Sequence, residues 1–287
     1  MNIANTLKRT LPAFALASAG LLGAGCADDA TPSGSDEADT GDSESESDSG
    51  EESESGSGTM ETETDTETET ETETAATEIN VSGEVTDFFT MAGIPGANVS
   101  VLDMPGFETV SDEEGEYAIP GMPPNTEVFF LIDGNEDTYW GGIRPATIPE
   151  ADVDDLQLGQ VSNELIDTQL SLLQQQDENV TADETKGVAI VRLRQPTATG
   201  AVVTFEPALP DGSYYGVDAD NKPVLNGDTI DSSLLPFWVA FNLEPADAGT
   251  YSVSVEHPER ECTVLHPSFP TLPRYVTLIE IDCPPAP

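Results

Sequence analysis

The fold is decided by three short segments: INVSGEV at 79–85, ANVSV at 97–101 and SDEEGEYAIPGMP at 111–123. Apolar and polar residues alternate in each segment, which is the pattern of a β-strand with one buried face. Pro and Gly residues between the segments fix or free φ and therefore predict turns. A continuous apolar run at 128–132 predicts a strand that is covered on both faces. We therefore expect a small antiparallel β-sandwich here.

Three motifs in this region resemble those of the carboxypeptidase regulatory-like domain. They are SGEV at 82–85, IPGANV at 94–99 and SDEEGEY at 111–117, and they occur in the order of that family. Two departures are that Pro95 directly precedes Gly96 and that Ser111 replaces a Thr. The resemblance implies a prealbumin-like, transthyretin-like sandwich, which we assign to residues 79–150. It implies little about function, because the motif residues serve packing and turns.

The N-terminus is typical of an export signal. Lys8 and Arg9 precede an apolar run at 11–25 that is too short to span a membrane, and Cys26 follows this run. Residues 1–25 resemble a bacterial lipoprotein signal peptide, although Gly23 stands where that family prefers Leu. The resemblance implies cleavage before Cys26, its acylation (with palmitate among the acyl groups), and a lipid anchor at the outer membrane or cell surface. Ordinary signal cleavage near Ala27 is the alternative.

Residues 26–78 form an acidic segment of Ser, Thr and Glu. From position 27 onward it holds 20 Asp or Glu and no Lys or Arg, so it cannot bury a core and is predicted to be disordered. Repulsion between its charges favours an extended spacer. A cation-binding or glycosylated stalk and a solvated tail without a partner are the alternatives. Residues 79–287 carry 35 acidic and seven basic side chains, which excludes nucleic acid as a partner.

Residues 151–180 are predicted to form a connecting amphipathic helix. Apolar side chains recur there at mostly three- to five-residue spacing, at Val153, Leu156, Val161, Leu165, Ile166, Leu170 and Leu173. Such helices usually pack on their own domain, and binding a partner protein is the alternative.

A second, degenerate copy of the sandwich is predicted over 181–287. Alternating apolar strands recur there, and GAVV at 200–203 repeats the pattern of GANV at 96–99. The acidic hairpin of the first copy corresponds to DADNKP at 218–223. The fold class is therefore mainly β, with two antiparallel β-sandwich domains, one connecting helix and a long disordered tether.

Cys262 and Cys283 are the two cysteines left once Cys26 is assigned to the lipid. An exported protein favours their pairing as a disulfide. Free thiols are the alternative, but no CxxC or HxC spacing supports redox or metal chemistry.

Metal and cofactor signals are weak. His257 and His266 are the only histidines, and the HExxH spacing is absent. The acidic clusters 133–137 and 218–221 offer several oxygens that could hold Ca²⁺, but neither matches a complete calcium loop, and Asx turns explain them equally well. We expect no cofactor.

Aromatic residues are the remaining candidates for a ligand site. Tyr139 and Trp140 precede two glycines and could form an exposed platform on which a sugar stacks. Trp238 lies between Phe237 and Val239, and such a strand position predicts a core residue.

Taken together, these patterns predict a non-catalytic lipoprotein of a bacterial envelope. It would present tandem β-sandwich modules on an acidic spacer for binding, adhesion or a structural role, with the membrane as one partner and a protein or glycan ligand as another. A carbohydrate-binding module and an accessory subunit of a secreted enzyme are the alternatives. No nucleophile elbow or phosphate-binding loop occurs in the sequence.

Overall fold

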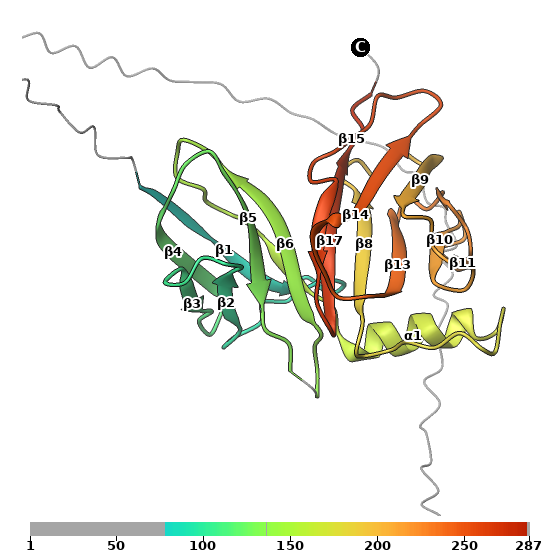
Figure 1. The fold of residues 1–287 in the computed structure, drawn as a ribbon, viewed down its shortest axis with the longest axis horizontal. Coiled ribbons are helices and arrows are strands. Elements are labelled where there is room, and N and C mark those ends of the chain that lie inside the picture. The colour runs from blue at the N-terminus through green and yellow to red at the C-terminus, as the bar shows by residue number, and fades with distance from the viewer. Residues whose placement is uncertain (1–77, 136, 286–287) are drawn as a thin grey trace, which may run out of the picture. The chain divides into compact units, whose positions relative to one another are not determined.

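The computed structural model describes residues 78–135 and 137–285 (Figure 1), which belong to one compact unit. The predicted signal peptide, the lipidation site Cys26 and nearly all of the predicted tether lie outside these residues. The first module contains the strands β1 (Ile79–Asp87), β2 (Asn98–Val101), β3 (Glu108–Val110), β4 (Glu116–Met122), β5 (Thr126–Ile132), β6 (Gly141–Ile148) and β7 (Leu158–Gln160). The helix α1 (Asn163–Leu173) follows it.

The second module consists of the strands that follow the helix, β8 to β17. They are β8 (Gly187–Leu193), β9 (Ala201–Glu206), β10 (Tyr214–Val217), β11 (Pro223–Leu225), β12 (Thr229–Ile230), β13 (Phe237–Leu243), β14 (Ala246–Glu256), β15 (Thr263–Val264), β16 (Ser268–Thr271) and β17 (Tyr275–Asp282). The mainly β fold class predicted from the sequence is confirmed.

The first module is a two-layer sandwich. One layer is the sheet β4-β1-β7, and the other is the run β3-β2-β5-β6 at the end of a longer sheet. Alternate residues of both layers fill the space between them, as the period-two pattern predicts. The fully buried ones include Val81, Ile119, Phe130 and Ile132.

The family-like motifs serve turns and packing in this module. The hydroxyl of Ser111 is buried, accepts a hydrogen bond from Ala97 N at 2.8 Å and donates one to Ile94 O at 2.7 Å. It therefore joins the IPGANV turn to the acidic hairpin. Asp112 Oδ1 accepts bonds from the backbone N–H groups of Glu114 and Glu116, and Gly115 closes this hairpin with φ of 94°.

The second module repeats this hairpin with other residues. Asp218 Oδ1 accepts bonds from the backbone N–H groups two and four positions later, at Asp220 and Lys222. Asn221 takes the place of Gly115 and has φ of 65°, a conformation that Asn tolerates better than most residues. The repeat noted in the sequence therefore extends to the hydrogen bonds of the turn.

The two modules share one continuous sheet. The last strand, β17, pairs in parallel with β6 of the first module and with β8 of the second, so that it lies between them (Figure 1). The order is β16-β14-β9-β12-β10-β13-β8-β17-β6-β5-β2-β3. The sequence analysis predicts antiparallel sandwiches, and these parallel pairings, with that of β1 and β7, depart from it. The prediction was wrong for these pairs because a period-two pattern carries no information about strand direction.

The predicted helix over 151–180 is too long. The structure has a helix only at Asn163–Leu173, with Ser162 accepting a hydrogen bond from Leu165 N as its N-cap. The segment before it forms β7, whose Leu158 pairs with Val85 of β1. Leu158 is fully buried in the first sandwich, and this packing overrides the helical spacing of the apolar residues.

The helix covers one face of the second module's sheet. Leu165, Ile166, Leu170 and Leu173 pack on Ile190 of β8 and Val239 of β13. The opposite face of the same strands forms a separate core around Trp238, Phe269 and Ile279. The helix is therefore part of the second module's packing, as expected for most amphipathic helices. Within the described residues no helix is both long and apolar enough to cross a membrane.

Candidate ligand-binding site

The predicted aromatic platform at Tyr139 and Trp140 does not form, because the Trp140 ring is buried and Tyr139 is half-buried. Trp140 is only 4% exposed and belongs to the core under α1, where it lines an apolar cavity of about 70 Å³. Its backbone N–H donates to Val161 O, which holds it against the segment leading into α1. Tyr139 is half-buried and packs on the first module's core. The platform prediction was wrong, because the two glycines lie inside β6 rather than in an open loop.

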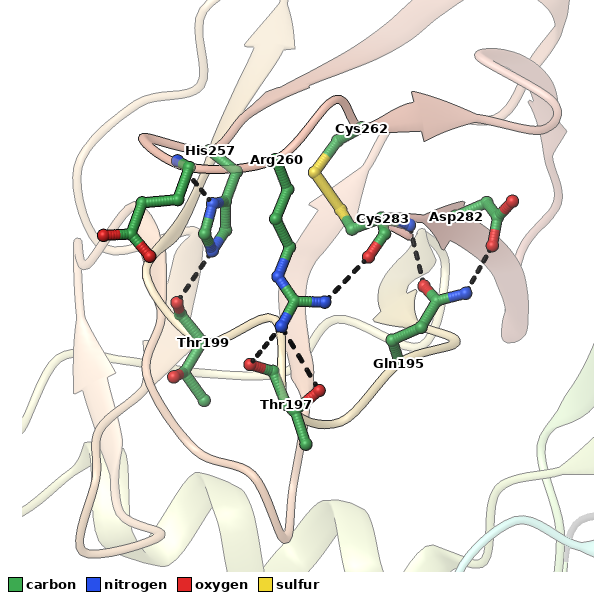
Figure 2. Close-up of a disulfide and its surroundings, with 9 residues drawn as sticks. Gln195, Thr197, Thr199, His257, Arg260, Cys262, Asp282 and Cys283 are labelled. Atoms are coloured by element: carbon green, nitrogen blue, oxygen red, sulfur yellow. Dashed lines mark hydrogen bonds between the residues drawn. A yellow bond between two sulfur atoms is a disulfide. The ribbon is translucent and has the colours of Figure 1, made fainter. Parts of the chain in front are cut away.

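Cys262 and Cys283 form a disulfide, with their Cα atoms 4.2 Å apart (Figure 2). Arg260 lies beside it and donates hydrogen bonds to Cys283 O and Thr197 O. The Gln195 side chain accepts a bond from Cys283 N and donates one to Asp282. The disulfide ties the end of β17 to the loop before β15, and the hydrogen bonds of Gln195 and Arg260 connect both to the loop after β8.

The predicted metal-ligand candidates have partners within the protein. His266 Nδ1 lies 3.0 Å from a carboxylate oxygen of Glu127, and His257 contacts Thr199 O. Asp133 accepts a hydrogen bond from the Tyr275 hydroxyl, and Asp218 accepts the two backbone bonds of its Asx turn. Among the described residues no group of three or more His, Cys, Asp and Glu could hold a metal ion.

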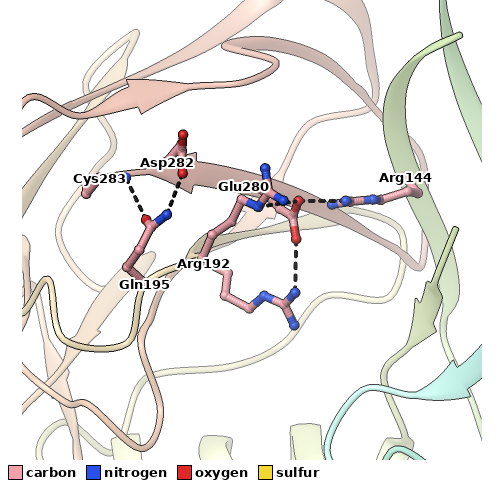
Figure 3. A network of polar contacts seen from close by, with 7 residues as sticks. Arg144, Arg192, Gln195, Glu280, Asp282 and Cys283 are labelled. Atoms are coloured by element: carbon pink, nitrogen blue, oxygen red, sulfur yellow. Dashed lines mark hydrogen bonds and ion pairs between the residues drawn. The ribbon is translucent and has the colours of Figure 1, made fainter. Parts of the chain in front are cut away.

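Among the described residues, the largest cluster of ion pairs lies around Glu280 on the shared strand. Glu280 of β17 contacts Arg144 of β6 at 2.7 Å and Arg192 of β8 at 2.9 Å (Figure 3), and Arg194 lies 3.9 Å from it. Glu280 and Arg192 are paired in the parallel register, so their side chains emerge on the same face of the sheet. One carboxylate therefore forms ion pairs with three guanidinium groups, and these come from both modules.

The arginines control the ionisation of this carboxylate. Burial on its own would raise the pKa of Glu280, but the positive charges and hydrogen bonds of Arg144 and Arg192 outweigh it and hold the pKa below its usual range. Glu280 is therefore ionised near neutral pH. Its side chain is 12% exposed, whereas those of Arg192 and Arg194 are 41% and 51% exposed.

A cleft of about 400 Å³ lies over this cluster, and we call it the arginine cleft. One wall comes from the first module and includes Phe88, Met91 and Leu156; the other is the sheet surface of Leu278 and Glu280 with the three arginines. Asp155 is the second acidic residue in its lining. The formal charge of the lining is thus +1, in a part of the chain where acidic residues outnumber basic ones five to one.

A second hollow of about 480 Å³ shares Phe88, Arg192 and Arg194 with the cleft, and we call it the Leu234 groove. Its walls include Phe89 and Leu234, which are 59% and 73% exposed. With Met91 of the cleft, these are three of the seven large apolar side chains that are exposed among the described residues. Exposed apolar groups are therefore concentrated next to the arginines.

The spacing and scarcity of arginines in the sequence could have pointed to this site. Arg192 lies near the end of β8 and Arg194 follows two residues later, just after the strand. Together with Arg144 they are three of only seven basic residues after position 78. Spacing by two predicts a shared face. The meeting with Arg144 required the parallel pairing at β17, which the sequence alone did not predict.

Comparisons with known proteins give no family assignment. No protein-family model matches the sequence, and no curated protein matches it. The resemblance to carboxypeptidase regulatory-like domains therefore stays a prediction beyond the β-sandwich itself.

Solved structures give only distant matches. The Bacillus anthracis TIE protein is 9% identical with a TM-score of 0.24, over 72% of this chain and 34% of its own length. Shaft pilin SpaA from Lactobacillus rhamnosus GG is 10% identical with a TM-score of 0.23, over 74% of this chain and 100% of its own. A streptococcal ancillary pilin is 12% identical with a TM-score of 0.24, over 74% and 64%. These TM-scores are too low to assign this chain a fold family or a role. Fold and site define the class: a mainly β protein of two fused modules with a cleft at the shared strand.

Proposed function

We propose that this chain is a non-catalytic lipoprotein of a bacterial envelope, anchored through Cys26, that presents its two β modules on an acidic spacer as a surface binding or adhesion element. The observation that carries the proposal is the shared strand β17, which makes the modules one continuous sheet. A unit of this kind keeps its binding surface fixed while the spacer sets its distance from the membrane.

The site chemistry favours binding over catalysis. The most strongly clustered polar groups are three arginines around one carboxylate, and Glu280 has its pKa lowered rather than raised. A general acid or base at neutral pH needs a carboxylate pKa that is raised toward the working pH. Charged groups arranged as donors next to apolar walls are suited to holding a ligand.

The carbohydrate-binding alternative depended on exposed aromatic rings. Trp140 and Trp238 are 4% and 1% exposed, so neither ring offers a stacking face to a sugar. We therefore rank a protein ligand ahead of a glycan ligand.

Lipid labelling and cell fractionation test the anchor. Cells that express the chain are fed an alkyne analogue of palmitate, and the wild type is compared with Cys26→Ala. We expect the wild type to carry the label, to fractionate with membranes and to be cut by protease added to intact cells. The Cys26→Ala protein should lose both the label and the membrane association. An unlabelled wild type released into the medium would overturn the lipoprotein assignment.

A further inference from the structure

We propose that the arginine cleft and the Leu234 groove together bind an acidic peptide segment of a partner protein, with its carboxylates on Arg192 and Arg194 and an apolar side chain packed on Phe89 and Leu234. This deepens the proposed function by naming the partner class, and it rests on the binding role proposed there. It does not depend on the lipid anchor.

The arginine cluster carries positive charge that is not fully balanced. Arg144, Arg192 and Arg194 converge on Glu280 at 2.7, 2.9 and 3.9 Å. Bringing three like charges together costs free energy, and one carboxylate compensates for only one of them. Arg144 is largely buried and donates to Glu280, and its Nε is buried without a hydrogen-bond partner among the described residues. Such a costly arrangement calls for an explanation beyond stability.

Two of the three arginines are exposed enough to meet a ligand. Arg192 and Arg194 are about half exposed and line both hollows. A guanidinium group has five N–H donors in a planar fork that fits a carboxylate. The single contact of Arg192 or Arg194 with Glu280 leaves donors available toward the solvent in the cleft.

The exposed apolar side chains beside the arginines distinguish between classes of acidic ligand. Phe89, Met91 and Leu234 are exposed beside the arginines and would stay in water if the ligand offered only charges and hydroxyl groups. Because Asp155 and Glu280 also line the cleft, the formal charge of its lining is only +1. This charge is low for a site that binds a highly charged polyanion. A peptide with Asp or Glu next to an apolar residue matches both the charge and the apolar walls.

The surroundings add selectivity to this match. The rest of the folded region is strongly acidic and has only four basic residues, so an acidic segment should be repelled by most of its surface and attracted where three arginines meet. Binding should therefore be localised, and it should weaken as salt screens the charges.

A peptide selection tests the proposal. A random peptide library displayed on phage is selected on the immobilised full chain in detergent, and the recovered peptides are then measured on purified variants. The selected peptides should be enriched in Asp and Glu beside Leu, Phe or Ile. Arg194→Gln and Leu234→Ser should each weaken their binding by about fivefold or more. Both side chains are exposed enough for these variants to keep the wild-type denaturation midpoint.

Matched controls make the same chemical changes elsewhere. Lys222→Gln removes one positive charge, and Leu265→Ser removes one exposed leucine, at positions outside both hollows. Neither should change the affinity of the selected peptides.

The proposal would be overturned if no peptides were recovered, if the peptides lacked acidic residues, or if they bound the variants as well as the wild type. Arginine-dependent binding of polygalacturonate in place of peptides would reassign the site to an acidic glycan. If lipid labelling failed, the lipoprotein assignment would fall, but the result of the peptide selection would still stand.

Discussion

At the residue scale, Glu280 links the stability of the fold to the candidate site. It is the acidic partner of arginines from both modules and lies on the strand that the modules share. Removing one partner of a buried ion pair lowers stability by more than the intact pair adds to it. The remaining partner is then a buried charge with no opposite charge beside it.

Glu280→Gln should therefore lower the free energy of unfolding by about 2 kcal/mol at neutral pH. Urea denaturation measures this directly. The same substitution at Glu244, an exposed residue that pairs with Lys186 at 2.8 Å, should have little effect. Equal effects of the two substitutions would contradict the role assigned to the arginine cluster.

The effect of Glu280→Gln should also depend on pH. Although burial opposes it, the pull of Arg144 and Arg192 lowers the pKa of Glu280 in the folded protein. A carboxylate with a lowered pKa stabilises the fold at pH values above its unfolded pKa, and this contribution is lost as the pH falls through the folded pKa. The stability difference between wild type and Glu280→Gln should thus shrink in acid, and a difference that stays constant down to pH about 2 would exclude this cause.

Trp140 is a core residue, so its substitution should act on stability. Trp140→Ala should lower the free energy of unfolding by about 3–5 kcal/mol, because it leaves a large cavity under α1. Phe89→Ala removes another aromatic ring, but from an exposed position, and should leave the denaturation midpoint nearly unchanged. A Trp140→Ala protein as stable as the wild type would mean that the ring is not buried.

At the element scale, β17 is the strand that connects the two modules. It pairs with β6, β8 and β15, and the disulfide at Cys283 directly follows its last residue. The disulfide closes a loop between residues 21 apart in sequence and so ties β17 to the loop before β15.

Loss of this bond should destabilise the second module. In the chain-entropy model a loop of this length contributes about 3 kcal/mol, so Cys262→Ala/Cys283→Ala should unfold at a clearly lower urea concentration than the oxidised wild type. Adding dithiothreitol should lower the wild-type midpoint toward that of the double variant and leave the double variant unchanged. A wild-type midpoint that does not respond to the reductant would argue that the bond adds no stability.

Strand content and the disulfide could be predicted from sequence, but how the strands meet could not. The alternation at 79–85 and 97–101 and the turn residues Ser111 and Gly115 are local signals, and the structure confirms the strands and turns that they predict. The parallel pairing of β17 and the burial of Trp140 depend on contacts between segments far apart in the chain. Local patterns do not record such contacts.

At the scale of the whole molecule, the described residues behave as one structural unit. The first module's sheet continues through β17 into the second, and salt bridges from Arg144 and Arg192 to Glu280 cross the same boundary. Domains joined only by a linker have small interfaces and move independently. A shared sheet prevents this, and the arginine cleft exists only while both modules stay joined.

Differential scanning calorimetry of the chain from residue 27 onward tests this claim most directly. Because β6 of the first module pairs directly with β17 of the second, unfolding of either module would leave the other with an unpaired strand edge. The account predicts a single transition whose van't Hoff enthalpy equals its calorimetric enthalpy. Two separate transitions, with β1–β7 melting at a different temperature from β8–β17, would contradict the fused unit and the cleft that depends on it.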